Sequence, residues 1–159
     1  MTKPNSKNPE YTVAFEEINL EDQNLINAAI KVLKANFHPK KHQIGCAVLA
    51  DSGKIYTAVN IQSSIYGPCA EVIAIGSAIA NGEKNIVSIV AVKKIDDEYP
   101  VISPCGGCRQ LILDYAHNST VILNIERRIL KTRATSLLPE PYENSFTAIA
   151  RSPSSDLSG

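Results

Sequence analysis

PCAEVIAIGSAIAN occupies residues 68–81, and it is followed by the apolar run IVSIVAV at 86–92 and by SPCGGCRQLILDYA at 103–116. The first and third segments place a cysteine directly after a proline, which suits the first turn of a helix because proline has no N–H to leave unpaired. They predict helices over 69–81 and 105–115. The central run is continuously apolar, as in a strand buried on both faces. This succession predicts an α/β fold.

The flanking sequence adds the remaining elements. Asn19 can cap a helix that places Leu25, Ala29 and Leu33 on one face. Two hairpins are predicted, with strands over 43–50, 55–61, 120–125 and 129–132, and a brief helix follows at 135–138. The order predicts a three-layer α/β/α sandwich with a mixed five-stranded sheet. We expect residues 1–18 to form a flexible N-terminal arm, 19–142 one catalytic domain, and the Ser-rich 143–159 a mobile tail.

Composition narrows the possible partners. The chain has 159 residues, of which 44% are hydrophobic, and 16 basic residues balance 16 acidic ones. A net charge of zero lacks the electrostatic footprint of a protein that grips long nucleic acid, so no polynucleotide partner is expected. The sequence shows no signal-like N-terminus and no apolar run of roughly 18 residues. It predicts a soluble, cytoplasmic protein with no membrane association.

Cysteines carry the clearest chemical signal. Cys69 and Cys105 stand at predicted helix starts, where unpaired N–H groups stabilise a thiolate, and Cys108 follows one turn later. Three thiolates would form an incomplete tetrahedral zinc site whose open position can take a water. Glu71 is well placed to move protons beside the metal. The alternatives are a closed structural site completed by Cys46 and a redox CxxC pair, which would leave Cys69 unexplained.

The motifs PCAE at 68–71 and PCGGC at 104–108 resemble the three-Cys branch of the zinc-dependent cytidine deaminase superfamily. The resemblance covers about residues 20–142 and includes Ile44-Gly45, Val59-Asn60-Ile61, Cys108-Arg109-Gln110 and Leu137-Leu138-Pro139. It implies that Cys69, Cys105 and Cys108 hold one Zn²⁺ per subunit. It also implies that Glu71 carries protons between the water, the pyrimidine and the departing ammonia.

The same resemblance implies the substrate contacts. Backbone groups near Ala70 and Ser103 would contact the base, and Asn60, with Gln62 nearby, would contact the sugar. Tyr142 would cap the pocket of a neighbouring subunit, since such enzymes are typically homotetramers.

Two further residues lie close to these motifs. His42 is a candidate for the mouth of the pocket, and Arg109 is a candidate donor to a zinc-bound thiolate.

Four positions depart from ordinary nucleoside deaminases. Val72 replaces the usual Arg after Cys-Ala-Glu, Gln62 replaces a Glu, and His42 and Tyr142 replace phenylalanines. Val72, Tyr142 and the Lys41-His42 pair are more similar to the blasticidin S deaminases.

We therefore expect a zinc-dependent hydrolase that replaces the 4-amino group of a cytosine nucleoside, or of a nucleoside-like compound of the blasticidin S type, with a keto oxygen. The alternatives are a cytidine or deoxycytidine deaminase of pyrimidine salvage, and a non-catalytic zinc-stabilised module that binds a nucleoside.

Overall fold

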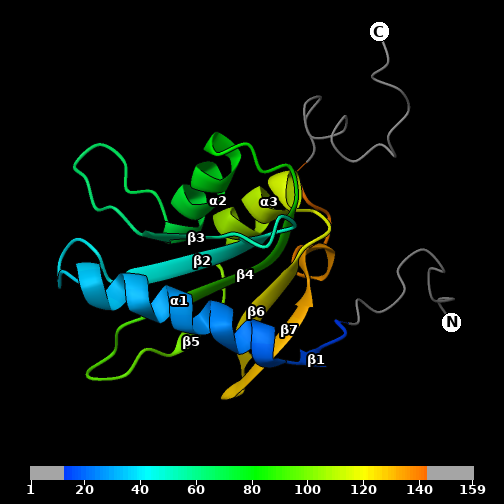
Figure 1. The fold of residues 1–159 in the computed structure, drawn as a ribbon, viewed down its shortest axis with the longest axis horizontal. Helices are drawn as coiled ribbons and strands as arrows, with labels where there is room; N and C mark the ends of the chain where they lie inside the picture. The colour runs from blue at the N-terminus through cyan, green and yellow to red at the C-terminus, as the bar shows by residue number, and fades with distance from the viewer. Residues whose placement is uncertain (1–12, 143–159) are drawn as a thin grey trace, which may run out of the picture.

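The computed structural model describes residues 13–142, and within them one twisted sheet forms the middle of the molecule (Figure 1). Its strands are β1 (Glu16–Glu17), β2 (Ile44–Ala50), β3 (Ile55–Val59), β4 (Ile86–Lys93), β5 (Val101–Ile102), β6 (Thr120–Ile125) and β7 (Arg128–Arg133). Their order across the sheet is β1-β7-β6-β4-β2-β3. The short strand β5 additionally pairs with β4, at Ala91 and Val92. β4 and β6 are parallel, and the other pairs are antiparallel.

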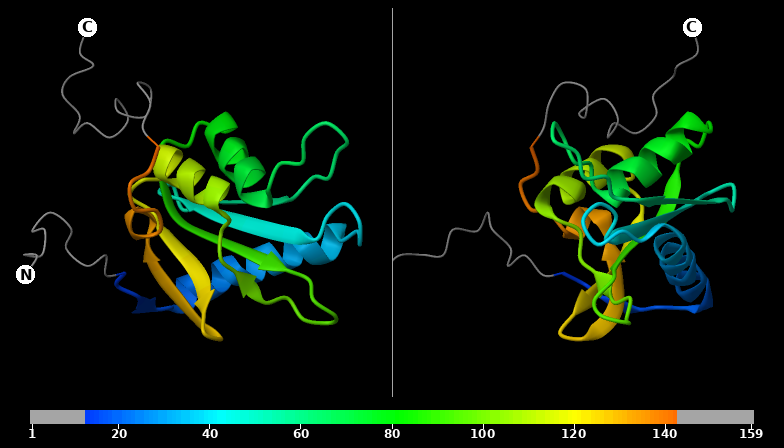
Figure 2. Two further views of the ribbon diagram at one scale, coloured as in Figure 1. Left: turned by 180° about the vertical axis from the view of Figure 1, so that it is seen from behind. Right: turned by 90° about the vertical axis from the view of Figure 1, so that its left-hand side faces the viewer.

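Helices cover both faces of the sheet. Helix α1 (Leu20–Asn36) lies on one face, and α2 (Ala70–Ala80) and α3 (Gly106–Tyr115) lie side by side on the other (Figure 2). A short 3₁₀ helix, η1 (Ala134–Ser136), follows β7. The predicted three-layer α/β/α sandwich is confirmed. The five predicted strands all form, but the predicted strand number is wrong because the two-residue strands β1 and β5 are too short to show a hydrophobic period.

The alternation of side chains in β2 separates two hydrophobic cores. Ala47 and Leu49 pack under α1, while Cys46 and Val48 pack under α2 and α3. Successive residues of a strand point to opposite faces, so a strand between two helical layers is apolar throughout. This explains why the run that starts at Ile44 shows no alternation.

The start of α1 is fixed by a capping box. The N–H of Asp22 donates to Asn19 Oδ1 at 3.0 Å, and the N–H of Asn19 donates to Asp22 Oδ2 at 2.9 Å. Lys131 of β7 also donates to Asp22 Oδ2 at 2.7 Å in a largely buried ion pair. The predicted Asn19 cap is confirmed, and the ion pair ties the start of α1 to β7.

The ends of the chain add one difference from the sequence-based expectation. Glu16 and Glu17 pair with Lys131 and Leu130, so the sheet begins inside the segment predicted as an arm. Residues 1–12 and the predicted tail 143–159 lie outside the described residues. The division into arm, domain and tail stays a prediction. Residues 13–142 contain no helix with the length and apolar character needed to span a membrane.

Candidate metal centre and active site

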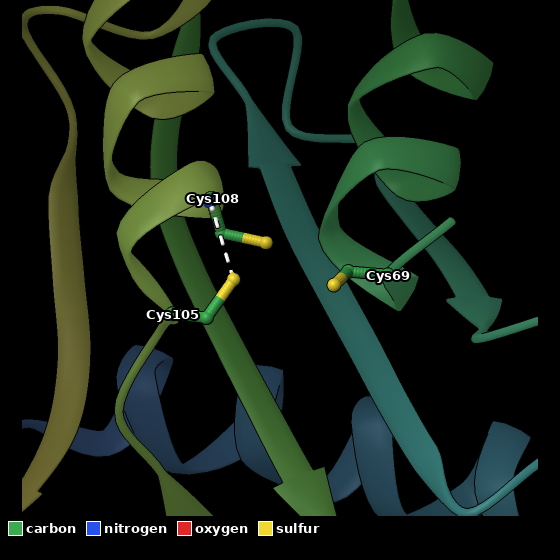
Figure 3. A group of neighbouring side chains, drawn as sticks. All are labelled: Cys69, Cys105 and Cys108. Carbon is green, nitrogen blue, oxygen red and sulfur yellow. Dashed lines mark hydrogen bonds between the residues drawn. The ribbon is translucent and has the colours of Figure 1, made fainter. Parts of the chain in front are cut away.

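Three cysteine side chains meet between the N-terminal ends of α2 and α3, and Figure 3 shows their sulfur atoms turned toward one another. The three Sγ atoms all lie within 4.8 Å of one another. Cys69 and Cys105 are the N-cap residues of the two helices, and Cys108 lies in the first turn of α3. The N–H of Cys108 donates to Cys105 Sγ at 3.4 Å. The structure thus brings together the three cysteines that the motifs single out.

Glu71 lies in the first turn of α2, two residues after Cys69, and only 4% of its surface is exposed. Burial raises the pKa of its carboxyl, and the backbone N–H of Glu71 and the nearby Cys108 thiol oppose this shift. The carboxyl therefore lies beside the sulfur cluster. A buried carboxyl at this position can exchange protons with a molecule bound at the cluster.

The three neighbouring thiols differ in how readily they lose a proton. Burial is the main cause of a raised pKa at Cys69 and at Cys108, and the charge of Glu71 adds to both shifts. Burial acts in the same direction at Cys105, but hydrogen bonds from the Cys108 backbone and thiol outweigh it and lower the pKa. Three adjacent thiolates therefore need a cation among them. Soft sulfur ligands in this number fit Zn²⁺.

Cys46 does not join this cluster. It lies in β2 with none of its surface exposed and packs in the core under α2 and α3. Burial raises the pKa of its thiol, as expected of an inert core cysteine. In the described part of the chain, the group that could hold a metal contains Cys69, Cys105 and Cys108 and leaves Cys46 out. The arrangement favours the open site over the closed four-thiolate alternative.

Asn60 follows β3 and holds the segment that precedes β2. Its Oδ1 accepts the N–H groups of Gln43 and Ile44 at 2.8 and 2.9 Å, and its Nδ2 donates to Lys41 O at 3.2 Å. His42 Nδ1 lies 2.8 Å from the Asn60 carbonyl oxygen. The Asn60 side chain is thus largely engaged by the backbone, and one Nδ2 hydrogen remains for a ligand.

The candidates for base contact flank the cysteines. Ala70 is the fully buried first residue of α2 and follows Cys69 directly. Ser103 lies between β5 and α3, and its Oγ donates to Asn124 O at 3.3 Å. Gln62 is exposed in the loop between β3 and α2. Their contacts with a substrate stay predictions.

In the described contacts, the Arg109 side chain donates to backbone carbonyl oxygens rather than to a sulfur atom. Its Nε donates to Pro104 O and its Nη1 donates to Leu137 O, both at 3.0 Å. These bonds join the start of α3 to the segment after η1. The predicted donation from Arg109 to a thiolate stays a prediction.

Gln110 is a residue to which sequence reasoning gave no role. Its side-chain amide contacts both the N–H and the carbonyl oxygen of Tyr142, a residue that is 72% exposed. Gln110 also donates to Asp114, one helical turn later on α3. The i, i+4 spacing of a glutamine and an aspartate was the signal available in the sequence.

Comparison with known proteins agrees with this site. A family model described as the cytidine and deoxycytidylate deaminase zinc-binding region matches residues 20–124. Blasticidin-S deaminase from Bacillus cereus is 37% identical over 132 residues, which are 79% of this chain and 94% of that protein. Cytidine deaminase from Sporosarcina psychrophila is 34% identical over 128 residues, 77% of this chain and 92% of the relative. The crystal structure of cytidine deaminase from Burkholderia pseudomallei superposes with a TM-score of 0.64 at 28% identity, covering 76% of this chain and 98% of that one.

An α/β/α sandwich that presents three thiols and a buried carboxyl at two helix starts defines a zinc-dependent hydrolase. The chain belongs to the cytidine and deoxycytidylate deaminase family, which confirms the resemblance carried by the two motifs. It is an enzyme of the aminohydrolase class, and its three cysteines fit one zinc ion per subunit.

Proposed function

We propose that this enzyme removes the 4-amino group of a cytosine nucleoside-like compound of the blasticidin S type and leaves a keto oxygen in its place. The observation that carries the proposal is the Glu71 carboxyl, buried beside the three-sulfur cluster. A module that only bound a nucleoside would have no need of a proton carrier at this position. The Bacillus cereus relative supports the substrate type, as do Val72, Gln62 and the Lys41-His42 pair.

The reaction exchanges an amino group for an oxygen. Zinc bound by Cys69, Cys105 and Cys108 supplies activation of the attacking water. Glu71 takes one proton from the water and transfers it to the pyrimidine N3 as the oxygen adds to C4. It then carries the proton of the new C4 hydroxyl to the amino group. The C4–N bond breaks, a C4 keto oxygen forms and ammonia leaves, so one carboxyl serves as base and acid in turn.

The remaining site residues bind and orient the substrate in this proposal. Backbone groups at Ala70 and Ser103 flank the cysteines and are suited to the base. Asn60, through its second Nδ2 hydrogen, and Gln62 are suited to the sugar. His42 stands next to Asn60, and Arg109 offsets the charge of the thiolates.

A homotetramer is part of the same proposal. The loop between β3 and α2 exposes 98% of Ile65 and 69% of Tyr66, and Tyr142 is 72% exposed. Large apolar side chains exposed in this way support burial against another subunit. In such an assembly Tyr142 would reach a neighbouring pocket. Light scattering of the purified protein should give four times the chain mass.

A cytidine or deoxycytidine deaminase of pyrimidine salvage is the second candidate, because the Sporosarcina psychrophila relative carries that name at 34% identity. The two candidates differ in what surrounds the cytosine rather than in the chemistry at C4. The departures at Val72 and Gln62 favour the blasticidin S type.

The test measures ammonia release from blasticidin S, cytidine and deoxycytidine by the purified zinc-loaded enzyme. The matched control is Glu71→Gln, whose zinc content is measured by elemental analysis. We expect the wild type to show its highest kcat/KM with blasticidin S. The Glu71→Gln variant should retain its zinc, and its rate should be more than about 1,000-fold lower. A preference for cytidine or deoxycytidine would establish the second candidate instead.

A further inference from the structure

The first turn of α3 carries Cys105 on a part of the chain with little side-chain packing around it. Cys105, Gly106 and Gly107 are all exposed, and a Cβ added at Gly106 would meet nothing within 4 Å. Inside the turn, the N–H of Cys108 donates to Cys105 Sγ at 3.4 Å, as Figure 3 marks. The position of Cys105 relative to Cys69 on α2 therefore depends on what holds this turn from outside it.

Arg109 supplies such a contact on both sides of Cys105. Its Nε donates to Pro104 O at 3.0 Å, and this carbonyl belongs to the peptide bond between Pro104 and Cys105. The N–H of Arg109 donates to Cys105 O at 2.9 Å. Pro104 is buried and Arg109 is partly buried, so water is largely excluded from these bonds. One residue thus holds the two peptide groups that flank the Cα of a zinc ligand and restricts how that ligand can rotate.

The same guanidinium reaches a distant segment of the chain. Its Nη1 donates to Leu137 O at 3.0 Å, and the Leu137 side chain is buried in the core under α2 and α3. The next residue of α3, Gln110, contacts the N–H and the carbonyl oxygen of Tyr142. Two successive residues of α3 therefore hold residues 137–142 at both ends.

The shape of the guanidinium suits this bridge better than its charge alone does. Its nitrogen atoms lie in one rigid plane, so Nε and Nη1 donate at the same time in two directions that are fixed relative to each other. A lysine ammonium keeps the positive charge, but it is a single centre on a flexible stem. It would not hold the carbonyls of Pro104 and Leu137 together in the same geometry.

We propose that Arg109 is a positioning residue that joins the zinc ligand Cys105 to residues 137–142, so that zinc binding and the attachment of Tyr142 stabilise each other. With Cys105 bound to zinc, the Pro104 carbonyl has one orientation, and it holds the guanidinium against Leu137 O. The coupling is reciprocal, because a contact that favours one state at both places changes both equilibria by the same factor. The inference rests on the proposed function only for the pocket-capping role of Tyr142.

The test measures two quantities that need no substrate. Competition with a chromophoric chelator gives the zinc Kd, and hydrogen exchange followed by mass spectrometry gives the exchange rate of the N–H groups in residues 134–142 at saturating zinc. Both are measured for the wild type, Arg109→Ala, Arg109→Lys and the control Arg128→Ala. Arg128 is exposed, and in the described contacts its side chain pairs only with Glu17.

We expect Arg109→Ala to raise the zinc Kd about 10- to 100-fold and to speed exchange in residues 134–142 about 10-fold, with exchange in α1 unchanged. Arg109→Lys should recover little of either loss, and Arg128→Ala should change neither quantity. Values equal to the wild type in Arg109→Lys would show that positive charge alone acts at this position and would overturn the inference. A change in only one of the two quantities in Arg109→Ala would overturn it as well.

A second variant tests the coupling from the other end. Gln110→Ala removes the hold on Tyr142, and in the described contacts the Gln110 side chain touches neither Pro104 nor Cys105. We expect it to raise the zinc Kd about 3-fold in the wild type and less than about 1.5-fold in Arg109→Ala, where the connection is already broken. Equal effects in the two backgrounds, or no effect in the wild type, would contradict the coupling. Absence of deamination alongside the expected zinc results would contradict the proposed function alone.

Discussion

The side-chain amide of Gln110 holds the backbone of Tyr142 through two hydrogen bonds. Gln110 Nε2 donates to Tyr142 O at 2.9 Å, and Tyr142 N–H donates to Gln110 Oε1 at 3.0 Å. Gln110 Nε2 also donates to Asp114 Oδ1 at 3.0 Å, which fixes the orientation of the amide. Helix α3 therefore carries a zinc ligand on one turn and positions the proposed pocket-capping aromatic with the next.

Loss of this contact should affect substrate binding more than chemistry. In the Gln110→Ala variant we expect KM to rise about 3- to 10-fold with kcat within about 2-fold, and the free energy of unfolding to fall by about 1 kcal/mol. Steady-state kinetics and urea unfolding measure both effects. Gln23→Ala is the matched control, because in the described contacts the side chain of Gln23 donates only to Asn27 of its own helix. Unchanged KM in Gln110→Ala, or the same change in both variants, would contradict a positioning role.

Zinc content distinguishes the open site from a closed one. We expect Cys105→Ala to lose most of its zinc, because two thiolates remain to hold the ion. Cys46→Ala should keep about one zinc per chain, since Cys46 lies in the core, and should lose only about 1 kcal/mol of stability. Elemental analysis after dialysis gives the ratios. Equal loss of zinc in both variants would show that Cys46 is a ligand.

Gly45 marks a close approach between α1 and β2. A Cβ at this position would lie 2.5 Å from Ala29 O and 2.8 Å from Leu33 Cβ. Ala29 O belongs to the backbone of α1 and cannot move aside as a flexible side chain could. Gly45→Ala should therefore lower the free energy of unfolding by about 1–3 kcal/mol. Gly76→Ala in α2 is the control: its Cβ meets nothing within 4 Å, so helix propensity should stabilise the protein by about 0.5–1 kcal/mol. Urea unfolding of both variants checks the opposite signs.

Glu83 gives the β2–β3 hairpin a dependence on pH. Ser52 Oγ and Tyr56 Oη both donate to Glu83 Oε1 at 2.7 Å, and these hydrogen bonds, Ser52 first, lower the pKa of the carboxyl from its usual 4.5. A folded pKa below the unfolded one means that stability is present above the unfolded value and is lost as pH falls through the folded value.

Glu83→Gln should therefore be less stable than the wild type at neutral pH, and the difference should shrink as the pH falls below 4.5. Urea unfolding across this range measures it, and Tyr56→Phe, which removes one donor, should reproduce part of the effect. A difference in stability that does not change with pH would show that the carboxylate contributes nothing through ionisation.

Local signals explain what the sequence predicts well. The Pro-Cys starts of α2 and α3 and the Asn81-Gly82 stop depend on neighbouring residues, so both helices could be predicted within one or two positions. The two Pro-Cys motifs and the CxxC spacing of Cys105 and Cys108 also indicate a metal site that includes Cys69. Buried strands such as β4 consist of long apolar runs, which can be recognised in a single sequence.

Other features depend on contacts between residues that are far apart in the sequence, and these could not be predicted. The partner of Gln110 lies 32 residues along the chain, and β1 pairs with β7 through the backbone over two residues, which leaves no periodic pattern. Asn60 could be placed near the sugar by resemblance. That its amide also holds the 41–44 segment depends on how β2 and β3 meet, which appears only in three dimensions.

The source of the oxygen that replaces the amino group tests hydrolytic deamination most directly. The zinc-loaded wild type and Glu71→Gln are incubated with blasticidin S in water enriched in ¹⁸O, and the product is analysed by mass spectrometry alongside an ammonia assay. We expect the wild type to release one ammonia for each product molecule and to place one ¹⁸O in that product, while Glu71→Gln should form almost no product. A product without ¹⁸O, or equal turnover in the two proteins, would contradict hydrolytic deamination assisted by Glu71.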